Sequence, residues 1–168
     1  MPRNPKDVKT LVTGGAGFIG ARCAALALES GHEVTVLDDL STGLRSRLDA
    51  LEAAGARIEL GDVRDANARA RALEGVDAVI HLAAQGSVPR SMEDPEATMD
   101  VNVHATDRLL EDMADRGLHR LVLASSAAVY GDVDGLPHTE DLVGARQSPY
   151  ADSKWANEQA VQRRREQG

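Results

Sequence analysis

Short runs of β-branched and aliphatic residues alternate with longer helical stretches along this chain of 168 residues. The predicted strands are Lys9 to Thr13, Glu33 to Asp38, Arg57 to Gly61, Ala78 to His81 and Arg120 to Ala124. The predicted helices are Phe18 to Ser30, Gly43 to Ala54, Asp65 to Leu73, Pro95 to Arg116 and Pro149 to Gln167. Because strands separated by helices form right-handed crossovers, the pattern predicts an α/β fold with a doubly wound parallel sheet.

Composition narrows the class of protein further. Hydrophobic residues make up 42% and charged residues 27%, which is ordinary for one soluble domain, so residues 1–168 are expected to form a single domain. A net charge of −8 disfavours binding to nucleic acid or to anionic membranes. There is no long apolar run, and the first ten residues are polar, so we expect a cytoplasmic protein. Cys23 is the only cysteine, which excludes an internal disulfide and suggests a buried small hydrophobe.

A glycine-rich turn, Leu11-Val-Thr-Gly-Gly-Ala-Gly-Phe-Ile-Gly20, connects the first predicted strand to the first predicted helix. Its glycines fit Gly15-x-Gly17-x-x-Gly20 or Gly14-x-x-Gly17-x-x-Gly20, and both suit a backbone that approaches a pyrophosphate. Asp38 ends the second predicted strand, where a carboxylate accepts from ribose hydroxyls and repels a 2′-phosphate. A plain strand-to-helix turn is the alternative. The sequence favours a Rossmann-like sheet, order 3-2-1-4-5, that binds NAD rather than NADP.

Tyr150 and Lys154 are four residues apart in the last predicted helix, so their side chains share one face. The lysine ammonium favours the phenolate, which makes the phenol a usable base near neutral pH. Ser126 follows the fifth predicted strand, at the sheet edge where α/β proteins bind ligands. A surface helix and a simple turn are the alternatives for these residues. Together they predict an acid/base set of Ser126, Tyr150 and Lys154.

In this order the motifs resemble the extended short-chain dehydrogenase/reductases, in particular the N-terminal half of the 4-epimerases of UDP-glucose or UDP-N-acetylglucosamine. The resemblance is carried by Gly14-Gly-Ala-Gly-Phe-Ile-Gly20, Asp38-Asp-Leu-Ser-Thr-Gly43, Gly61-Asp-Val-Arg-Asp65, His81-Leu-Ala-Ala84, Asn102, Ser125-Ser-Ala-Ala-Val-Tyr-Gly131 and Tyr150-Ala-Asp-Ser-Lys154. It implies an NAD-dependent isomerase of carbohydrate metabolism that acts on a nucleotide sugar. Another NAD-dependent nucleotide-sugar dehydrogenase or reductase of the same family is an alternative.

The resemblance also implies roles for single residues. Asp62 and Val63 would contact the adenine, Leu82 to Ala84 would line the dinucleotide channel, and Lys154 would hold the nicotinamide ribose. The cofactor-binding set is Gly14, Gly17, Phe18, Ile19, Gly20, Asp38, Asp39, Ser41, Gly43, Asp62, Val63, Leu82, Ala83, Ala84, Asn102, Tyr150 and Lys154. The substrate set is Ser87, Ser126 and Tyr150, and no metal is expected. As alternatives, Asp62 could cap a helix, Leu82 to Ala84 could be strand-end packing, and Asn102 could be a helix-surface amide.

The implied reaction passes through a transient 4-keto sugar. Tyr150 takes the proton of the C4 hydroxyl while the C4 hydride passes to NAD⁺, and return of the hydride to the other face of the sugar completes a C4 epimerisation. The dehydratases of the family carry an acidic pair just after the serine, whereas this chain has Ala127 and Ala128. Since alanine cannot transfer a proton, the sequence favours epimerisation. The stretch Gln85 to Ser91 resembles the substrate loop of UDP-hexose 4-epimerases, although a polar loop stiffened by Pro89 is the alternative.

Family members normally continue well beyond the lysine helix, with further strands and a small substrate domain. The fifth strand is therefore expected to be an exposed edge unless another chain covers it. Two classes of function follow: a UDP-hexose 4-epimerase, short or half of a split enzyme, and an NAD-binding module without turnover. Homodimers of the family often pair through the helices that correspond to 95–116 and 149–167, so a homodimer, or association with a separate C-terminal half, is the expected assembly.

Overall fold

The computed structural model describes residues 8–135 and 137–167, and the chain divides into two compact units. Unit 1 comprises the described part of Met1–Ala83 together with Glu111–Leu123. Unit 2 comprises Ala84–Leu110 and the described part of Ala124–Gly168. That the whole chain forms a single domain stays a prediction.

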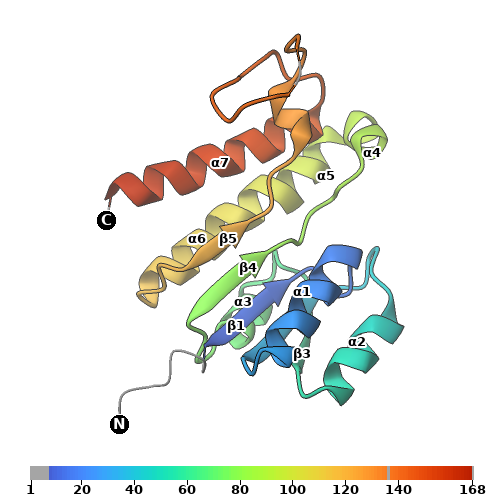
Figure 1. Cartoon of the computed structure of the whole chain (residues 1–168), viewed down its shortest axis with the longest axis vertical. Coiled ribbons are helices and arrows are strands. Elements are labelled where there is room, and N and C mark those ends of the chain that lie inside the picture. Colours follow the sequence, from blue (N-terminus) through green and yellow to red (C-terminus); the bar gives the residue numbers. More distant parts are fainter. Residues whose placement is uncertain (1–7, 136, 168) are drawn as a thin grey trace. The chain divides into compact units, whose positions relative to one another are not determined.

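Unit 1 is built on a five-stranded sheet in the order β3-β2-β1-β4-β5, and all its strand pairs are parallel (Figure 1). The strands are β1 (Lys9–Thr13), β2 (Glu33–Asp38), β3 (Arg57–Leu60), β4 (Ala78–His81) and β5 (Leu121–Leu123). The predicted α/β class and strand order are confirmed. Central strands of a parallel sheet are covered on both faces, and accordingly Leu11, Val12 and Val36 are fully buried.

Three helices cover the sheet of unit 1: α1 (Phe18–Glu29), α2 (Arg45–Ala53) and α3 (Ala66–Ala72). Helix α1 packs against β1 and β2, and α3 packs against β2 and β3. Gly31, with a φ of +84°, ends α1 because the His32 amide can then reach back to the Ala27 carbonyl oxygen at 3.0 Å. The predicted boundaries of these elements differ from the observed ones by no more than two residues. Cys23 is only partly buried, so the expectation of a buried cysteine is met in part.

Unit 2 is mostly helical, with α4 (Val88–Glu93), α5 (Pro95–Met99), a π-helical turn (Asp100–His104), a 3₁₀ turn (Ala127–Tyr130) and α7 (Pro149–Gln167). Helix α6 (Ala105–Asp115) contributes residues to both units. Helix α7 packs against α4, α5 and both turns. The helical stretch predicted from Pro95 to Arg116 is observed as α5, the π-helical turn and α6, and the change of helix type in its middle was not predicted. The prediction also missed α4.

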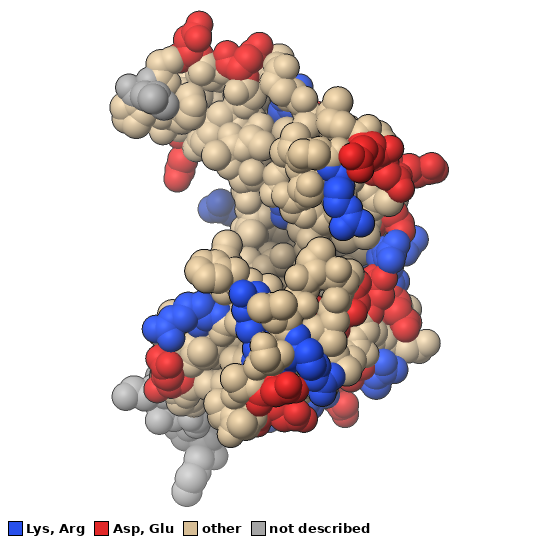
Figure 2. Space-filling view, turned by 90° about the vertical axis from the view of Figure 1, so that its right-hand side faces the viewer, with Lys and Arg blue, Asp and Glu red and all other residues tan. Residues whose placement is uncertain are grey.

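The sheet of unit 1 ends in β3 on one side and in β5 on the other. The Val122 side chain on β5 is 62% exposed. Figure 2 shows Lys and Arg side chains interspersed with Asp and Glu over the viewed face, so the net charge is not gathered there in one patch. Within residues 8–135 and 137–167, no helix has both the length and the hydropathy to cross a membrane. The same residues contain no cluster of three or more His, Cys, Asp or Glu that could hold a metal ion.

Candidate functional site

The glycine-rich turn of unit 1 packs directly on the end of β4. Gly14 has a φ of +72°, and a Cβ there would lie 2.8 Å from the Ala83 amide nitrogen. A Cβ on Gly17 would lie 3.1 Å from the Gly14 carbonyl oxygen, and one on Gly20 would overlap the same oxygen. Glycine is therefore required by the close approach of backbone to backbone. The turn leads into α1, whose first two side chains, Phe18 and Ile19, are 82% and 62% exposed.

Asp38 connects the glycine-rich turn to the segment after β2. It is 9% exposed, its Oδ2 accepts from the Ala16 amide at 2.9 Å, and its Oδ1 accepts from the Leu40 amide at 2.8 Å. A Cβ on Gly43 would lie 3.1 Å from Asp38 Oδ1 and would overlap the Ala16 side chain. Each carboxylate oxygen keeps a lone pair for a further donor such as a ribose hydroxyl. The buried position of Asp38 thus fits its predicted role.

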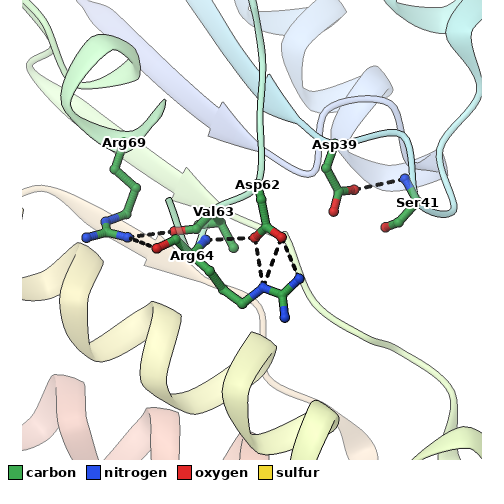
Figure 3. A network of polar contacts seen from close by, with 6 residues as sticks. All are labelled: Asp39, Ser41, Asp62, Val63, Arg64 and Arg69. Atoms are coloured by element: carbon green, nitrogen blue, oxygen red, sulfur yellow. Dashed lines mark hydrogen bonds and ion pairs between the residues drawn. The ribbon is translucent and has the colours of Figure 1, made fainter. Parts of the chain in front are cut away.

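Asp39 and Ser41 lie beside Asp38 but are exposed. The Asp39 carboxylate accepts from the Ser41 amide at 2.9 Å, which closes a short turn (Figure 3). Their cofactor role stays a prediction.

Asp62 and Val63 follow β3, and each is held by an arginine (Figure 3). The Arg64 guanidinium donates to both carboxylate oxygens of Asp62 at 2.5 to 3.1 Å. This hydrogen bonding lowers the pKa of the Asp62 carboxyl, although partial burial acts in the opposite direction. The alternative that Asp62 caps the next helix is wrong, because Asp65 is the N-cap residue and accepts from the Asn67 amide. If Asp62 contacts an adenine, its carboxylate has to bind the adenine and the Arg64 guanidinium at the same time.

Arg69 of α3 is buried to 4% exposure and anchors the segment after β3. One guanidinium nitrogen donates to the carbonyl oxygens of Val63 and Arg64 at 2.9 and 2.8 Å, as Figure 3 shows, and another pairs with Asp112 at 2.6 Å. Neither Arg64 nor Arg69 is among the residues predicted to form the site. Alanine and arginine alternate in this helix, and this pattern does not predict which arginine is buried.

Replacing Arg69 with methionine is expected to lower the free energy of unfolding by about 3 kcal/mol, because the partly buried Asp112 carboxylate and two carbonyl groups lose their shared donor. Urea denaturation followed by circular dichroism measures the change. Arg71→Met is the matched control, since the exposed Arg71 guanidinium pairs with Glu59 at the surface and its loss should change stability little. Equal effects of the two substitutions would contradict the anchoring role of Arg69.

A buried hydroxyl–imidazole pair fixes the ends of β1 and β4. Thr13 Oγ1 lies 2.7 Å from His81 Nδ1 and accepts from the Leu82 and Ala83 amides, each at 3.2 Å. Leu82, Ala83 and the following Ala84 are all partly buried. Their role in a dinucleotide channel stays a prediction, but hydrogen bonding as well as packing defines this strand end. Thr13 and His81 are not among the predicted site residues, although His81 begins the His-Leu-Ala-Ala segment.

Tyr150, Lys154 and Ser126 all lie in unit 2. Tyr150 and Lys154 are in the first two turns of α7, and Ser126 begins the 3₁₀ turn, where its hydroxyl accepts from the Ala128 amide at 3.2 Å. Lys154 is 4% exposed and its Nζ donates to the Ala124 carbonyl oxygen at 3.0 Å. Burial lowers the pKa of the Lys154 ammonium. The lysine thereby ties α7 to the chain two residues before Ser126, and the structure brings these predicted elements together because α7 contacts the 3₁₀ turn.

Asn102 lies in the π-helical turn and is fully buried, so the alternative of a helix-surface amide is wrong. Its Oδ1 accepts from the Gln85 amide at 2.8 Å, and its Nδ2 donates to the Gln85 carbonyl at 3.2 Å and to Ser153 Oγ at 2.9 Å. Ser153 donates in turn to the Tyr150 carbonyl oxygen at 2.7 Å. Asn102 thus connects the segment after β4 with α7. Single π-helical turns within helices are frequent at functional sites. A direct cofactor contact by Asn102 stays a prediction.

Ser87 begins helix α4, where its side chain accepts from the Arg90 amide at 3.3 Å. The alternative of a polar loop stiffened by Pro89 is wrong, because this proline is in the first turn of α4, where its missing N–H costs nothing. Contact of Ser87 with a substrate stays a prediction.

Comparisons with known proteins agree with this arrangement. The NAD dependent epimerase/dehydratase family matches residues 10–168. A UDP-glucose 4-epimerase of Corynebacterium glutamicum is 38% identical over 154 residues, which cover 92% of this chain and 46% of that protein. A UDP-glucose 4-epimerase of Streptomyces lividans is 41% identical, over 88% of this chain and 45% of that protein. The chain thus spans about half the length of the curated relatives it matches.

A solved structure shows the same fold. The crystal structure of UDP-glucose-4-epimerase from Stenotrophomonas maltophila, with bound NAD and formylated UDP-arabinopyranose, superposes with a TM-score of 0.90 at 32% identity and covers 96% of this chain and 49% of its own. Because the family match extends over nearly all of the sequence and the fold agrees, this chain belongs to the NAD dependent epimerase/dehydratase family.

Proposed function

We propose that this chain provides the NAD-binding and acid/base part of a nucleotide-sugar epimerase that interconverts UDP-hexoses at C4. The observation that carries the proposal is the placement of Tyr150 and the buried Lys154 on α7, against the 3₁₀ turn that Ser126 begins. Membership of the family supports the choice of NAD as the cofactor.

The residues of unit 1 fit a dinucleotide. The Gly14 to Gly20 turn leaves no space for a Cβ at Gly14 or Gly20, and it leads into α1, whose first backbone amides would donate to a pyrophosphate. Asp38 offers its remaining lone pairs to ribose hydroxyls, and its negative charge would repel a 2′-phosphate. The rest of the proposed cofactor-binding set in unit 1 is Gly17, Phe18, Ile19, Asp39, Ser41, Gly43, Asp62, Val63, Leu82 and Ala83. The set continues in unit 2 with Ala84, Asn102, Tyr150 and Lys154.

In unit 2, Tyr150 would take the proton of the C4 hydroxyl of the sugar and later return it. Ser126 would donate a hydrogen bond to the same oxygen, which stabilises it as the C–O bond gains double-bond character. The Lys154 ammonium would favour the phenolate form of Tyr150. Bound NAD would supply the acceptor, and later the donor, of the C4 hydride. The product of the first half-reaction is a 4-keto sugar, and its reduction on the opposite face gives the epimer.

Ala127 and Ala128 support epimerisation over elimination of water. Both lie in the 3₁₀ turn directly after Ser126, and a methyl group can neither give nor take a proton. An NAD-binding part without turnover is the second candidate, which is favoured by the close-packed glycine-rich turn and the buried Asp38, because these features of unit 1 suit a cofactor without the acid/base residues of unit 2. Pairing of two copies through residues 95–116 and 149–167 belongs to the same proposal.

One assay separates the two candidates. The purified chain is incubated with NAD and one nucleotide sugar at a time. The sugars are UDP-glucose, UDP-galactose and their N-acetylated counterparts, and the products are followed by chromatography. Interconversion of any epimer pair supports the epimerase. Bound NAD with no conversion of any sugar would leave the NAD-binding part as the function of this chain, and the absence of NAD binding would refute both candidates.

A further inference from the structure

Arg47 of α2 holds the middle of the glycine-rich turn. Its Nη1 donates to the Ala16 carbonyl oxygen at 3.0 Å, and the Leu44 amide donates to the same oxygen at 3.1 Å. On the other side of Ala16, its amide donates to Asp38 Oδ2 at 2.9 Å. Ala16 is fully buried between these contacts. Arg47 and Asp38 therefore fix, from opposite sides, the turn proposed to bind the pyrophosphate.

Arg47 also contacts the aromatic ring that begins α1. Its guanidinium carbon lies 5.9 Å from the centroid of the Phe18 ring, which is within the range of a cation–π interaction. The Phe18 side chain is 82% exposed, so few other groups restrict it. The planar guanidinium serves both contacts at once, and a lysine in its place would reproduce them poorly.

Among the described residues, Arg47 differs from the neighbouring arginines in having no carboxylate partner. Arg45, two residues earlier, pairs with Asp49 at 2.9 Å, and the exposed Arg22 pairs with Glu29 at 3.4 Å. In the part of the chain that the structure describes, no carboxylate forms an ion pair with Arg47. A positive charge beside this turn and the first residue of α1 attracts phosphate, and partial burial weakens its screening by salt.

We propose that Arg47 is a cofactor-binding residue that attracts the diphosphate of the dinucleotide and holds the glycine-rich turn and Phe18 in their binding positions. This inference rests on the proposed binding of NAD and adds to it a residue that the sequence motifs did not include. The charge predicts a salt-dependent contribution to affinity. Because of the hydrogen bond to Ala16, the glycine-rich turn of the unliganded chain is expected to be more ordered with Arg47 than without it.

Calorimetric titration of NAD and of ADP-ribose into the whole chain tests the inference. Arg47→Met is expected to raise the dissociation constants of both ligands about tenfold, because ADP-ribose carries the same diphosphate. Arg47→Lys keeps the charge and is expected to raise them about threefold. When the salt concentration is raised from about 50 to about 500 mM, the affinity of the wild-type chain for NAD should fall more than the affinity of Arg47→Met, because only the wild type has the charge that salt screens. Arg22→Met, an exposed arginine of α1, should behave as the wild type.

Hydrogen exchange of the unliganded chain supplies a readout that does not depend on the cofactor. The amides of Ala16 to Gly20 are expected to exchange faster in Arg47→Met than in Arg22→Met. The inference would be overturned if Arg47→Met had the same affinity for NAD and the same exchange rates as the wild type. It would also be overturned if Arg22→Met lost as much affinity as Arg47→Met. An equal loss in Arg47→Lys and Arg47→Met would overturn the role of the charge. If the wild type binds NAD and Asp38→Ala weakens binding while Arg47→Met does not, only this inference fails; if the wild type binds no NAD, the proposed function fails with it.

Discussion

Replacing Tyr150 with phenylalanine is expected to slow the interconversion of UDP-hexoses by about 10³-fold while NAD stays bound, because general acid/base catalysis by one group accounts for a factor of this order. The substitution removes only the hydroxyl, so the packing of α7 against the 3₁₀ turn is retained. The expected signature is a fall in kcat with little change in the affinity for NAD. Initial rates over a range of UDP-hexose concentrations, together with a titration of NAD, measure both quantities.

The chain offers a matched control, since it has two tyrosines. Tyr130 stacks on His138 with ring centroids 5.0 Å apart, and its backbone carbonyl accepts from the Gly144 amide at 3.0 Å. Tyr130→Phe keeps the ring and both interactions, so its rate should stay within about threefold of the wild type. A large loss in Tyr130→Phe with normal turnover in Tyr150→Phe would assign the proton transfer to the other phenol.

Replacing Gly20 with alanine is expected to lower the free energy of unfolding by about 3 kcal/mol and to abolish NAD binding. A Cβ at this position would overlap the Gly14 carbonyl oxygen and would lie 2.8 Å from its carbon and 2.9 Å from the Gly15 Cα. All three are backbone atoms, so no side chain can rotate away. Alanine would ordinarily stabilise a helical position by about 1 kcal/mol relative to glycine, but the clash outweighs this gain. Chemical denaturation and NAD titration give the two readouts.

Gly86→Ala is the control for the Gly20 substitution. Nothing lies within 4 Å of a Cβ built on Gly86, and its backbone does not have the positive φ that favours glycine. Its stability should therefore stay close to that of the wild type. If Gly20→Ala proved as stable as Gly86→Ala, the close packing of α1 on the glycine-rich turn would be disproved.

The parts of the fold that follow from local pattern could be predicted. Strands β1, β2 and β4 and helix α7 have the predicted ends, because β-branched runs and helical stretches alternate clearly there. The π-helical turn Asp100–His104 was not predicted, since it inserts one residue into a helix without changing the composition. Helix α4 was missed because it is short and contains Pro89, which is compatible with a helix only in its first turn.

The sequence by itself determined the α/β class, the strand order, the glycine-rich turn with Asp38, and the spacing of Tyr150 and Lys154, because each depends on residues close together in the chain or on general rules of strand connection. Only the tertiary structure decided which polar side chains are buried or partly buried and which groups they bind. Arg69 binds the carbonyls after β3, Asn102 binds Gln85, Lys154 binds Ala124, and the partly buried Arg47 binds Ala16. Those contacts join residues brought together by folding. A buried polar group forms its hydrogen bonds with whichever groups lie next to it in the folded chain, and the spacing of residues along the sequence does not predict which groups those are.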